Sequence, residues 1–369
     1  MKKIKFVNLL LVILLFALLL SGCAQGKVEQ GSAPAAEQKT EQKAEPKEEP
    51  KAEPKPITLS YAFFAPAQSF PGVQMQKFAE EVEKRTNGLV KFETFPGGTL
   101  LDAAEMYDGV LSGVADIGLG APGYDAGRFP LSSGIALPVG FPNAQVASMT
   151  MWDLIQEFKP EEYAKYKIIT VFTGEPGHII SVGPIRTLED LAGLQIRCRG
   201  ADVPVMKALG ASPTAMSMPD VAQALATKAI SANMGSREVL KDFKLAELVK
   251  YANDYSLTVL TFAAVMDINK WNELPADVQK VMEEVGKEMV LWTAKYHDIE
   301  NVQDAMEWAK KEYGLQEINL SPEEKARWDK KIEPLIEEWI KDMEAKGLPG
   351  RQFINRLLEL KDKYAKEYK

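Results

Sequence analysis

The hydrophobic pattern after residue 56 changes period repeatedly, from the two-residue spacing of strands to the wider spacing of helices. It predicts three strands and two intervening helices in the first part, with strands at 57–64, 90–95 and 115–119 and helices at 72–86 and 101–111. Strands that alternate with helices of this length predict βαβ units and a parallel sheet. Ligands of such a sheet bind beyond the carboxyl ends of its strands, so the loop residues Gln68 and Tyr124 are candidates for substrate binding.

The alternation of strands and helices continues to about residue 256. The pattern predicts strands at 166–173, 179–182, 195–198, 212–218 and 229–233, a loop at 174–178, and helices at 144–158, 203–209 and 220–227. A continuous apolar strand at 257–266 is long enough to pass between two lobes, and one apolar stripe runs along a helix predicted at 275–313.

These elements predict an α/β fold with two lobes. At 369 residues and 46% hydrophobic content, the chain is long for one core and sufficient for two. We expect a first lobe at 57–173, completed by part of the C-terminal segment, and a second lobe at 174–256. Residues 257–369 supply the crossing strand, the long helix and the C-terminal helices. The amphipathic tail is compatible with packing on the lobes or with a homodimer, and the pattern leaves both open.

The N-terminus has the pattern of a lipoprotein signal peptide. Three lysines precede an apolar run from Phe6 to Leu20, and Leu20-Ser-Gly-Cys23 closes it. This predicts a signal peptide at 1–22 and acylation of Cys23, which would anchor the protein to the extracytoplasmic face of the cell membrane. A transmembrane anchor that stays attached is the competing interpretation, but the apolar run is short for a bilayer.

Residues 23–56 are predicted to be a disordered tether. After the cysteine they contain no large aromatic residue, and they repeat Lys-Ala-Glu-Pro-Lys at 43–47 and 51–55. Such a segment cannot bury a core, and its mixed charge and prolines keep it extended.

Composition narrows the function classes. The formal net charge of −8 and a pI near 5.2 disfavour a nucleic-acid partner, which would need a basic face. With two cysteines and two histidines, neither a disulfide framework nor a His/Cys metal site is expected, and no cofactor is predicted.

One glycine motif suggests a nucleotide-binding site, but its surroundings do not fit. Gly118-Leu-Gly-Ala-Pro-Gly123 follows a predicted strand and matches G-x-G-x-x-G. The dinucleotide fold needs a helix to start there, and Pro122 with the residues after it offers none. We expect these glycines to leave room for a ligand or a neighbouring backbone.

The most informative stretch is the short strand at 195–198. Alternation places Ile196 and Cys198 on one face and Arg197 and Arg199 on the other. Burying a guanidinium is costly unless an acid answers it, and its planar fork fits a carboxylate. A ligand carboxylate and an internal Arg–Glu pair are equally compatible with these residues alone.

The segments around this strand resemble the substrate-binding subunits of TRAP transporters, the tripartite ATP-independent periplasmic transporters for organic acids. The resemblance rests on Leu191-Ala-Gly-Leu-Gln-Ile-Arg197, Leu209-Gly-Ala-Ser-Pro213, Ala224-Leu225 and Asn269-Lys-Trp-Asn-Glu-Leu-Pro275. It covers roughly residues 57–350. The resemblance implies a type II periplasmic-binding-protein fold, an organic-acid ligand whose carboxylate is bound by Arg197, and an integral-membrane permease as partner.

Other candidate binding residues depart from the family pattern. Where such receptors often carry a second arginine, this chain has Gly177-His178, so His178 is the candidate there. Met218 stands where an aromatic residue often covers the ligand. The asparagine that touches ligand in family members matches Gly235, with Asn233 two residues earlier, and Arg237 is a further donor.

Three functions remain in order of preference. The first is a lipid-anchored receptor that closes on a carboxylate and delivers it to a TRAP permease. The second is a similar receptor that serves an ABC transporter or a sensor. The third, an enzyme, is disfavoured because the chain lacks G-x-S-x-G and H-E-x-x-H, and no histidine lies near Cys198 in sequence.

Overall fold

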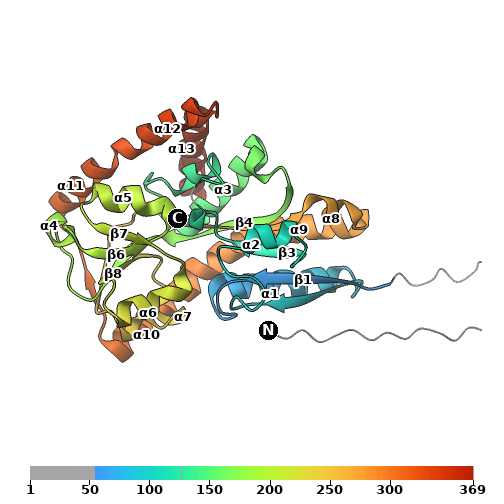
Figure 1. Ribbon diagram of the computed structural model, residues 1–369, viewed down its shortest axis with the longest axis horizontal. Coiled ribbons are helices and arrows are strands. Elements are labelled where there is room, and N and C mark those ends of the chain that lie inside the picture. Colours follow the sequence, from blue (N-terminus) through green and yellow to red (C-terminus); the bar gives the residue numbers. More distant parts are fainter. Residues whose placement is uncertain (1–54, 126, 369) are drawn as a thin grey trace, which may run out of the picture. The chain divides into compact units, whose positions relative to one another are not determined.

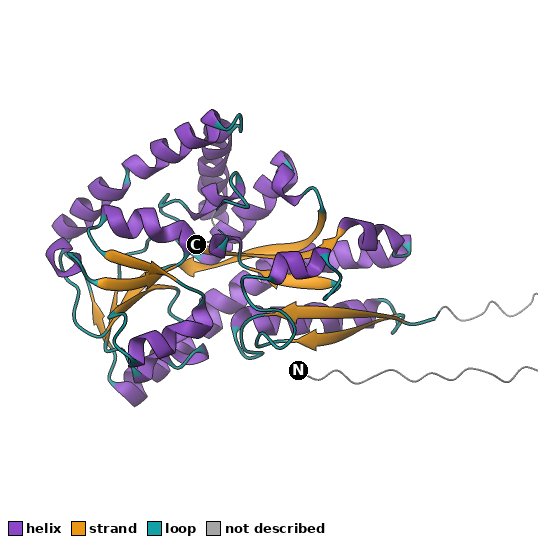
Figure 2. Cartoon of the chain, viewed as in Figure 1, coloured by secondary structure: helices purple, strands orange, loops and turns teal. Residues whose placement is uncertain are grey.

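The computed structural model describes residues 55–125 and 127–368 (Figure 1). The predicted signal peptide, Cys23 and nearly all of the tether lie outside the described residues. Within them, no helix combines the length and the apolar character needed to cross a membrane. The strands gather in two sheets with helices around each (Figure 2), as the predicted α/β class requires.

The first sheet contains both parallel and antiparallel pairs. Its order is β2–β1–β3–β10–β4, with β1 at Ile57–Phe63, β2 at Val90–Phe95, β3 at Ile117–Gly120, β4 at Tyr166–Pro176 and β10 at Val259–Asp267. Strand β1 pairs in parallel with β2 and β3, which confirms the predicted βαβ units, whereas β10 is antiparallel to β3 and β4.

Local hydrogen bonds between side chains and the backbone determine where the helices of the first lobe begin. Helix α1 is Phe70–Arg85 and α2 is Met106–Leu111, shorter than the predicted 101–111. The start is later because Asp102 Oδ1 accepts hydrogen bonds from the backbone N–H groups of Ala104 and Glu105, at 2.8 and 2.9 Å, which form a turn before the helix.

The second sheet has the order β11–β9–β5–β8–β6–β7. Its strands are β5 at His178–Ser181, β6 at Gln195–Cys198, β7 at Ser212–Ala215, β8 at Ala232–Gly235, β9 at Tyr251–Asn253 and β11 at Gln316–Ile318. The short helices of this lobe are α4 at Leu188–Leu191, α5 at Val203–Ala208, α6 at Val221–Ala226 and α7 at Val239–Asp242. Strand β6 lies between β8 and the edge strand β7 and is parallel to both.

Two extended segments cross between the sheets side by side. The loop predicted at 174–178 is wrong, because β4 continues to Pro176 and β5 starts at His178, with only Gly177 between them. The Gly177 N–H donates to the carbonyl of Thr258 at 2.7 Å, and its carbonyl accepts from the Leu257 N–H at 2.9 Å. This pairing holds the backbone extended although proline and glycine are typical turn residues.

The third crossing is helical and contains a break. Instead of one helix over 275–313, α9 spans Ala276–Tyr296, a π-helical turn covers His297–Asn301, and α10 spans Val302–Tyr313. Helix α9 packs on β4, α1 and α3 (Ala144–Phe158), whereas α10 packs on α7 of the second lobe. The π turn therefore lies where the long helix passes from one lobe to the other.

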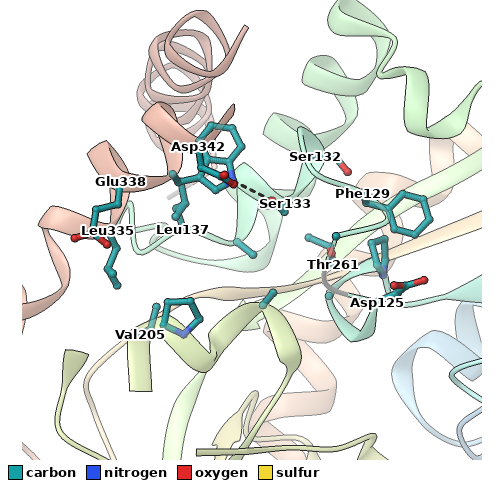
Figure 3. A pocket seen from close by; sticks show the side chains of 17 residues that line it. Asp125, Phe129, Ser132, Ser133, Leu137, Val205, Thr261, Leu335, Glu338 and Asp342 are labelled. Atoms are coloured by element: carbon teal, nitrogen blue, oxygen red, sulfur yellow. Dashed lines mark hydrogen bonds between the residues drawn. The ribbon is translucent and has the colours of Figure 1, made fainter. Parts of the chain in front are cut away.

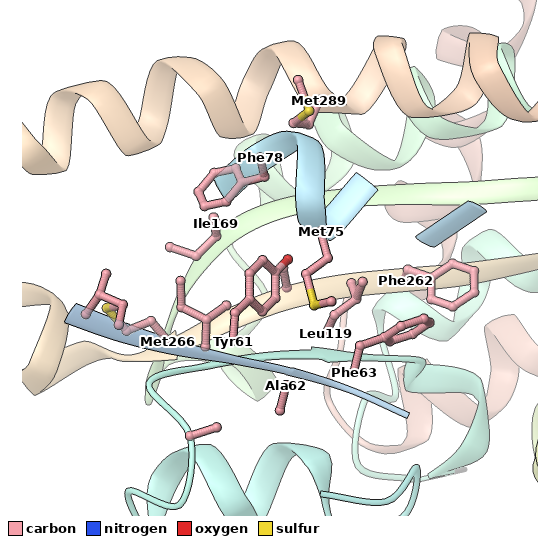
Figure 4. Close-up of a cluster of buried hydrophobic side chains, with 14 of the residues drawn as sticks. Tyr61, Ala62, Phe63, Met75, Phe78, Leu119, Ile169, Phe262, Met266 and Met289 are labelled. Atoms are coloured by element: carbon pink, nitrogen blue, oxygen red, sulfur yellow. The ribbon is translucent and has the colours of Figure 1, made fainter. Parts of the chain in front are cut away.

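The core of the first lobe lies on both faces of its sheet, as strand alternation requires. On β10, Phe262 and Met266 face a cluster with α1 and α9, whereas Ala263 and Val265 face a cluster with α3 and α13 (Gly350–Glu367). Figure 4 shows the first of these clusters, with side chains of β1, β4 and β10 beneath those of α1 and α9.

The C-terminal helices connect the two lobes a fourth time. They are α11 at Pro322–Ile332, α12 at Pro334–Ala345 and α13, whereas the short helix α8 at Ile268–Glu273 lies between β10 and α9. Helix α11 contacts α4 and α5 of the second lobe, while α13 packs on α3 of the first. In the described chain the amphipathic tail therefore packs on the lobes.

Candidate functional site

A cavity between the two sheets brings together loops from both lobes. The first lobe contributes the segment between β1 and α1, with Phe64, Ser69 and Phe70, and Tyr124 after β3. The second lobe contributes Arg197 from β6 together with the following residues: Arg199, Met218, Met234, Gly235, Ser236, Glu238, Val239, Asp242 and Phe243. The carboxyl ends of β1, β3, β6 and β8 all meet here, which is where open α/β sheets bind their ligands.

Arg197 is buried in this cavity without an acidic partner. Its side chain is 2% exposed. Its Nε donates to the carbonyl of Met216 at 3.0 Å, Nη1 donates to Asn233 Oδ1 at 3.0 Å, and Nη2 donates to the hydroxyl of Tyr124 at 3.4 Å. No ion pair joins it to an aspartate or glutamate among residues 55–125 and 127–368. A buried cation held by neutral groups calls for an anion from outside the chain.

Arg199, two residues along the same strand face, has the opposite environment. Its Nη2 donates to Asp202 Oδ1 at 2.8 Å and its Nε donates to the other oxygen of that carboxylate. Its remaining donor, Nη1, reaches the carbonyl of Val259 at 2.8 Å. Arg199 therefore makes the internal ion pair and links the second lobe to the crossing strand β10.

Asn233 and Gly235 shape the space beside Arg197. The Asn233 side chain is fully buried, and its Nδ2 has no hydrogen-bond partner among the described residues. A Cβ placed on Gly235 would lie 3.2 Å from that Nδ2 and 4.0 Å from Nη1 of Arg197. The missing side chain of Gly235 thus leaves a space that borders two donors, one of them charged.

Tyr124 and Met218 complete this end of the cavity. The Tyr124 hydroxyl accepts from the Met218 backbone N–H at 3.3 Å, and the guanidinium carbon of Arg197 lies 5.9 Å from the centre of the tyrosine ring. The Tyr124 ring contacts Phe64 edge-on at 5.5 Å between centroids. Since Tyr124 belongs to the first lobe and Arg197 to the second, these contacts span the cleft.

Three predicted binding residues lie away from the cavity. Gln68 is exposed and lines a different surface pocket, near Asp304. Arg237 forms a bidentate pair with Glu175, at 3.0 and 2.8 Å from Nε and Nη2. His178 is buried on β5, where it pairs with Gly235 of β8, and its Nδ1 lies 3.1 Å from the Asn253 carbonyl.

The charge of Glu175 is compensated by neighbouring residues of the same chain. Burial alone would raise the pKa of Glu175, but the hydrogen bonds from Arg237, with the electrostatic attraction of the neighbouring His178 and Arg237, hold that pKa below its usual value. Burial lowers the pKa of His178. The positive charge of Arg237 is thus paired with an internal acid, whereas that of Arg197 is not paired with any acid among the described residues.

The far side of the cavity contains polar residues that the sequence did not single out. Ser236, Glu238 and Asp242 line it and connect to His297 of the π turn, whose Nε2 lies 3.0 Å from Ser236 Oγ. Burial raises the pKa of Glu238 well above its usual value, and burial raises the pKa of Asp242 to about 7. The sequence offered one signal for these residues: Ser236, Glu238 and Asp242 come shortly after Gly235, which was already a candidate for ligand binding.

A second cavity of about 310 Å³ lies beneath α12 (Figure 3). Asp125, Glu338 and Asp342 line it, and the dashed line marks the hydrogen bond from the Trp339 indole to Ser133, at 3.0 Å. Among the described residues no arginine or lysine lines this cavity. An anion therefore favours the Arg197 cavity on electrostatic grounds.

Comparison with known proteins assigns the family. Residues 61–342 match the model of the DctP family, described as bacterial extracellular solute-binding protein, family 7. The chain belongs to this family. Its members are solute receptors of transporters, and the chain is accordingly a receptor of the TRAP type rather than an enzyme.

Individual relatives agree with this assignment. A TRAP periplasmic solute-binding protein from Desulfovibrio salexigens, solved as an open complex, is 41% identical with a TM-score of 0.75, covering 84% of this chain and 96% of that one. One from Rhodoferax ferrireducens with copurified benzoate is 26% identical with a TM-score of 0.80, covering 85% and 100%. The C4-dicarboxylate-binding protein DctB of Bacillus subtilis is 25% identical over 297 residues, which cover 79% of this chain and 82% of DctB.

Proposed function

We propose that this TRAP receptor binds a monocarboxylate with a largely apolar, aromatic body in the cavity at Arg197. The observation that carries the proposal is the buried guanidinium of Arg197, which no acid among the described residues neutralises. A carboxylate in the space left by Gly235 would accept from Arg197 and from the unused Nδ2 of Asn233. Charge-assisted bonds of this kind are about twice as strong as neutral ones.

The rest of the cavity favours an aromatic body behind the acid. Phe64, Phe70, Phe243 and Phe262 line it together with Met218. Aromatic rings stack favourably on one another, and methionine sulfur contacts ring edges favourably. The relative with copurified benzoate supports an aromatic acid, whereas a C4-dicarboxylate would place its second charge against aromatic side chains or beside the acidic side chains of Glu238 and Asp242.

A thermal-shift series tests the proposal. Benzoate, phenylacetate and succinate would be added to the purified chain up to millimolar concentration. A ligand at about 100 times its dissociation constant adds about 2.7 kcal/mol to the free energy of unfolding. We expect the aromatic acids to raise the melting temperature and succinate to leave it unchanged. A shift with succinate alone would contradict the aromatic assignment.

We also propose that the receptor is held on the extracytoplasmic side of the cell membrane by acyl chains on Cys23 and delivers its ligand to TRAP permease subunits. The support is the Leu20-Ser-Gly-Cys23 ending of the apolar run. A tether of the composition of residues 24–56 would let the receptor reach the permease from a fixed anchor. Cells fed a labelled fatty-acid analogue should label the wild type and leave Cys23→Ala unlabelled. Equal labelling of both proteins would refute the anchor.

A further inference from the structure

The cavity beneath α12, called the α12 cavity below, lies on the opposite face of the crossing strand β10 from the cavity at Arg197 (Figure 3). Leu260 and Phe262 of β10 line the Arg197 cavity, whereas Thr261 between them lines the α12 cavity. Neighbouring side chains of a strand point to opposite faces, so β10 forms a wall of both cavities. The α12 cavity is therefore a separate site, which the proposed carboxylate binding does not use.

Acidic side chains stand on two opposite walls of the α12 cavity. Asp125 follows β3 in the first lobe, whereas Glu338 and Asp342 lie one helical turn apart on α12. Figure 3 shows Asp125 near Thr261 on one side of the cavity and Glu338 on the other. No arginine or lysine among the described residues lines the space between them. The cavity thus presents negative charge at two separate places.

The three carboxylates differ in how far other side chains of the chain compensate them. Lys346 reaches Asp342 at 2.7 Å, and Arg128 lies 3.7 Å from Asp125. Both pairs are partly exposed to water, where an ion pair contributes little. Glu338 has no ion pair with any of the described residues. A cation that enters the cavity would therefore still meet net negative charge.

A hydroxyl group without a partner lies at the Asp125 end of the cavity. Thr261 is only 4% exposed, and its side chain makes no hydrogen bond with the described residues. Thr173, which pairs with it across the sheet, instead donates to the Ala144 carbonyl at 3.3 Å. Buried hydroxyl groups normally have a hydrogen-bond partner. The free lone pairs of Thr261 therefore indicate a group that donates to it from the cavity.

The arrangement fits an organic cation better than a metal ion. In the part of the chain that the structure describes, no three His, Cys, Asp or Glu side chains are grouped to hold a metal ion. Between the acids the walls are largely apolar, with Leu137 of the first lobe, Val205 of the second and Leu335 of α12. Methylene groups are stabilised by burial against such walls. Charge at both ends and an apolar middle together describe a cation with two charged ends.

We propose that the α12 cavity binds a small aliphatic diamine. One ammonium group lies near Asp125 and the hydroxyl of Thr261, the other lies at Glu338 and Asp342, and the methylene chain packs on the apolar walls between them. Each ammonium group has three N–H donors and no acceptor, which matches ends that offer acceptors. This site takes a cation, so it goes beyond the carboxylate function and does not depend on it.

Calorimetric titration of the purified full chain with cadaverine and pentylamine tests the inference. The two amines have carbon chains of equal length, but pentylamine lacks the second ammonium group. We expect cadaverine to bind at least about fivefold more tightly at low salt, the contribution of a partly exposed ion pair. The difference should shrink at high salt, because exposed charges are screened. Equal affinities at low salt, or no binding of cadaverine at millimolar concentration, would overturn the inference.

The variant Glu338→Gln removes the one carboxylate of the α12 wall that has no cation beside it. The preference for cadaverine over pentylamine should fall below about twofold. Glu337→Gln is the matched control, because Glu337 is on the same helix but pairs with Arg351 at 2.7 Å and does not line the cavity. This control should keep the full preference. Equal behaviour of the two variants would overturn the assignment.

Two further variants test the location of the diamine. Thr261→Val keeps the branched shape and removes the hydroxyl, so cadaverine should bind about threefold more weakly or worse. Unchanged affinity would remove Thr261 from the site. Asp242→Asn, in the other cavity, should bind cadaverine like the wild type. Binding that is lost in Asp242→Asn and kept in Glu338→Gln would place the diamine in the Arg197 cavity and overturn the inference.

Discussion

Replacing Arg197 by methionine, with the same replacement at Arg199 as its control, separates a ligand anchor from a structural ion pair. Arg197 on β6 is 2% exposed, and Arg199, one residue beyond the end of β6, is 3% exposed. Among residues 55–125 and 127–368, only Arg199 has an acid within reach, Asp202 at 2.8 Å. Methionine is similar in length and apolar, so either variant removes the charge without leaving a large hole.

The two variants should differ in ligand affinity. Without Arg197, the ligand carboxylate is buried with no cation, which costs roughly 2–5 kcal/mol of binding free energy, or about 30-fold to several thousand-fold in affinity. Arg199→Met leaves the anion site at Gly235 and Asn233 in place. Any Arg199→Met protein that folds should therefore bind within about tenfold of the wild type.

In the absence of ligand, the order of the effects should reverse. Arg197→Met removes a charge that has only neutral partners, so the free energy of unfolding should change by no more than about 1 kcal/mol. Arg199→Met leaves Asp202 buried and unpaired, which typically costs about 3–5 kcal/mol. Urea unfolding of both apo variants measures this difference.

Calorimetry on the same preparations measures the affinities. Wild-type affinity in Arg197→Met would refute the anchor. An apo Arg197→Met protein that loses as much stability as Arg199→Met would show that Arg197 is part of the folded framework instead. Arg197→Lys adds a further check, because an ammonium retains the charge but not the planar fork, so that affinity should recover only in part.

Three further predictions follow from neighbouring features. Gly235→Ala should weaken carboxylate binding by at least about tenfold with little loss of apo stability, since its Cβ would occupy the space 3.2 Å from Asn233 Nδ2; unchanged affinity by calorimetry would place the carboxylate elsewhere. Burial raises the pKa of Asp242 from 3.8 to about 7, so between these values only the unfolded chain ionises and the stability of the wild type falls as pH rises. Asp242→Asn should therefore gain more over the wild type at pH 8 than at pH 4.5, by on the order of 2–4 kcal/mol in urea titrations, and a pH-independent difference would argue against a protonated Asp242. Small-angle scattering should show a smaller radius of gyration at saturating ligand, because the lobes are joined by narrow crossings, and an unchanged radius would contradict closure.

Local patterns were sufficient to predict much of the fold. The period change between strand and helix locates β1, α1, β2 and β3, and the type of connection between them makes the sheet parallel. The wrong predictions lie where contacts between residues far apart in the sequence determine the local structure. The backbone of Gly177 is extended because it pairs with 257–258, some 80 residues away by chain numbering, which a window around Pro176 cannot reveal. The π turn in the long helix was not predicted either, because the apolar stripe continues across it and gives no local sign of a break.

Of the candidate site, only the part that follows from strand alternation or from the family resemblance could be predicted from the sequence. Both placed Arg197 on the face that lines the cavity. Which arginine meets an internal acid depends on three-dimensional neighbours: Asp202 lies three residues from Arg199, but Glu175 lies 62 residues from Arg237. Loop position alone placed Gln68 near the ligand, yet the loop turns its side chain to the surface. The role of each residue toward ligand remains a prediction.

If the ligand carboxylate binds at Arg197 as proposed, the uncompensated charge of this residue would couple ligand binding to lobe closure. In the conformation seen here, Tyr124 of the first lobe lies within 3.4 Å of Arg197 on the second, so closing the cleft removes water from the guanidinium. Without an anion, closure leaves a buried charge supported only by neutral groups, which is unfavourable. With a carboxylate present, the same closure strengthens the ion pair because the surroundings become less polar. On this proposal the ligand would have a higher affinity for the closed state than for the open one, and this difference would allow it to shift the equilibrium between them.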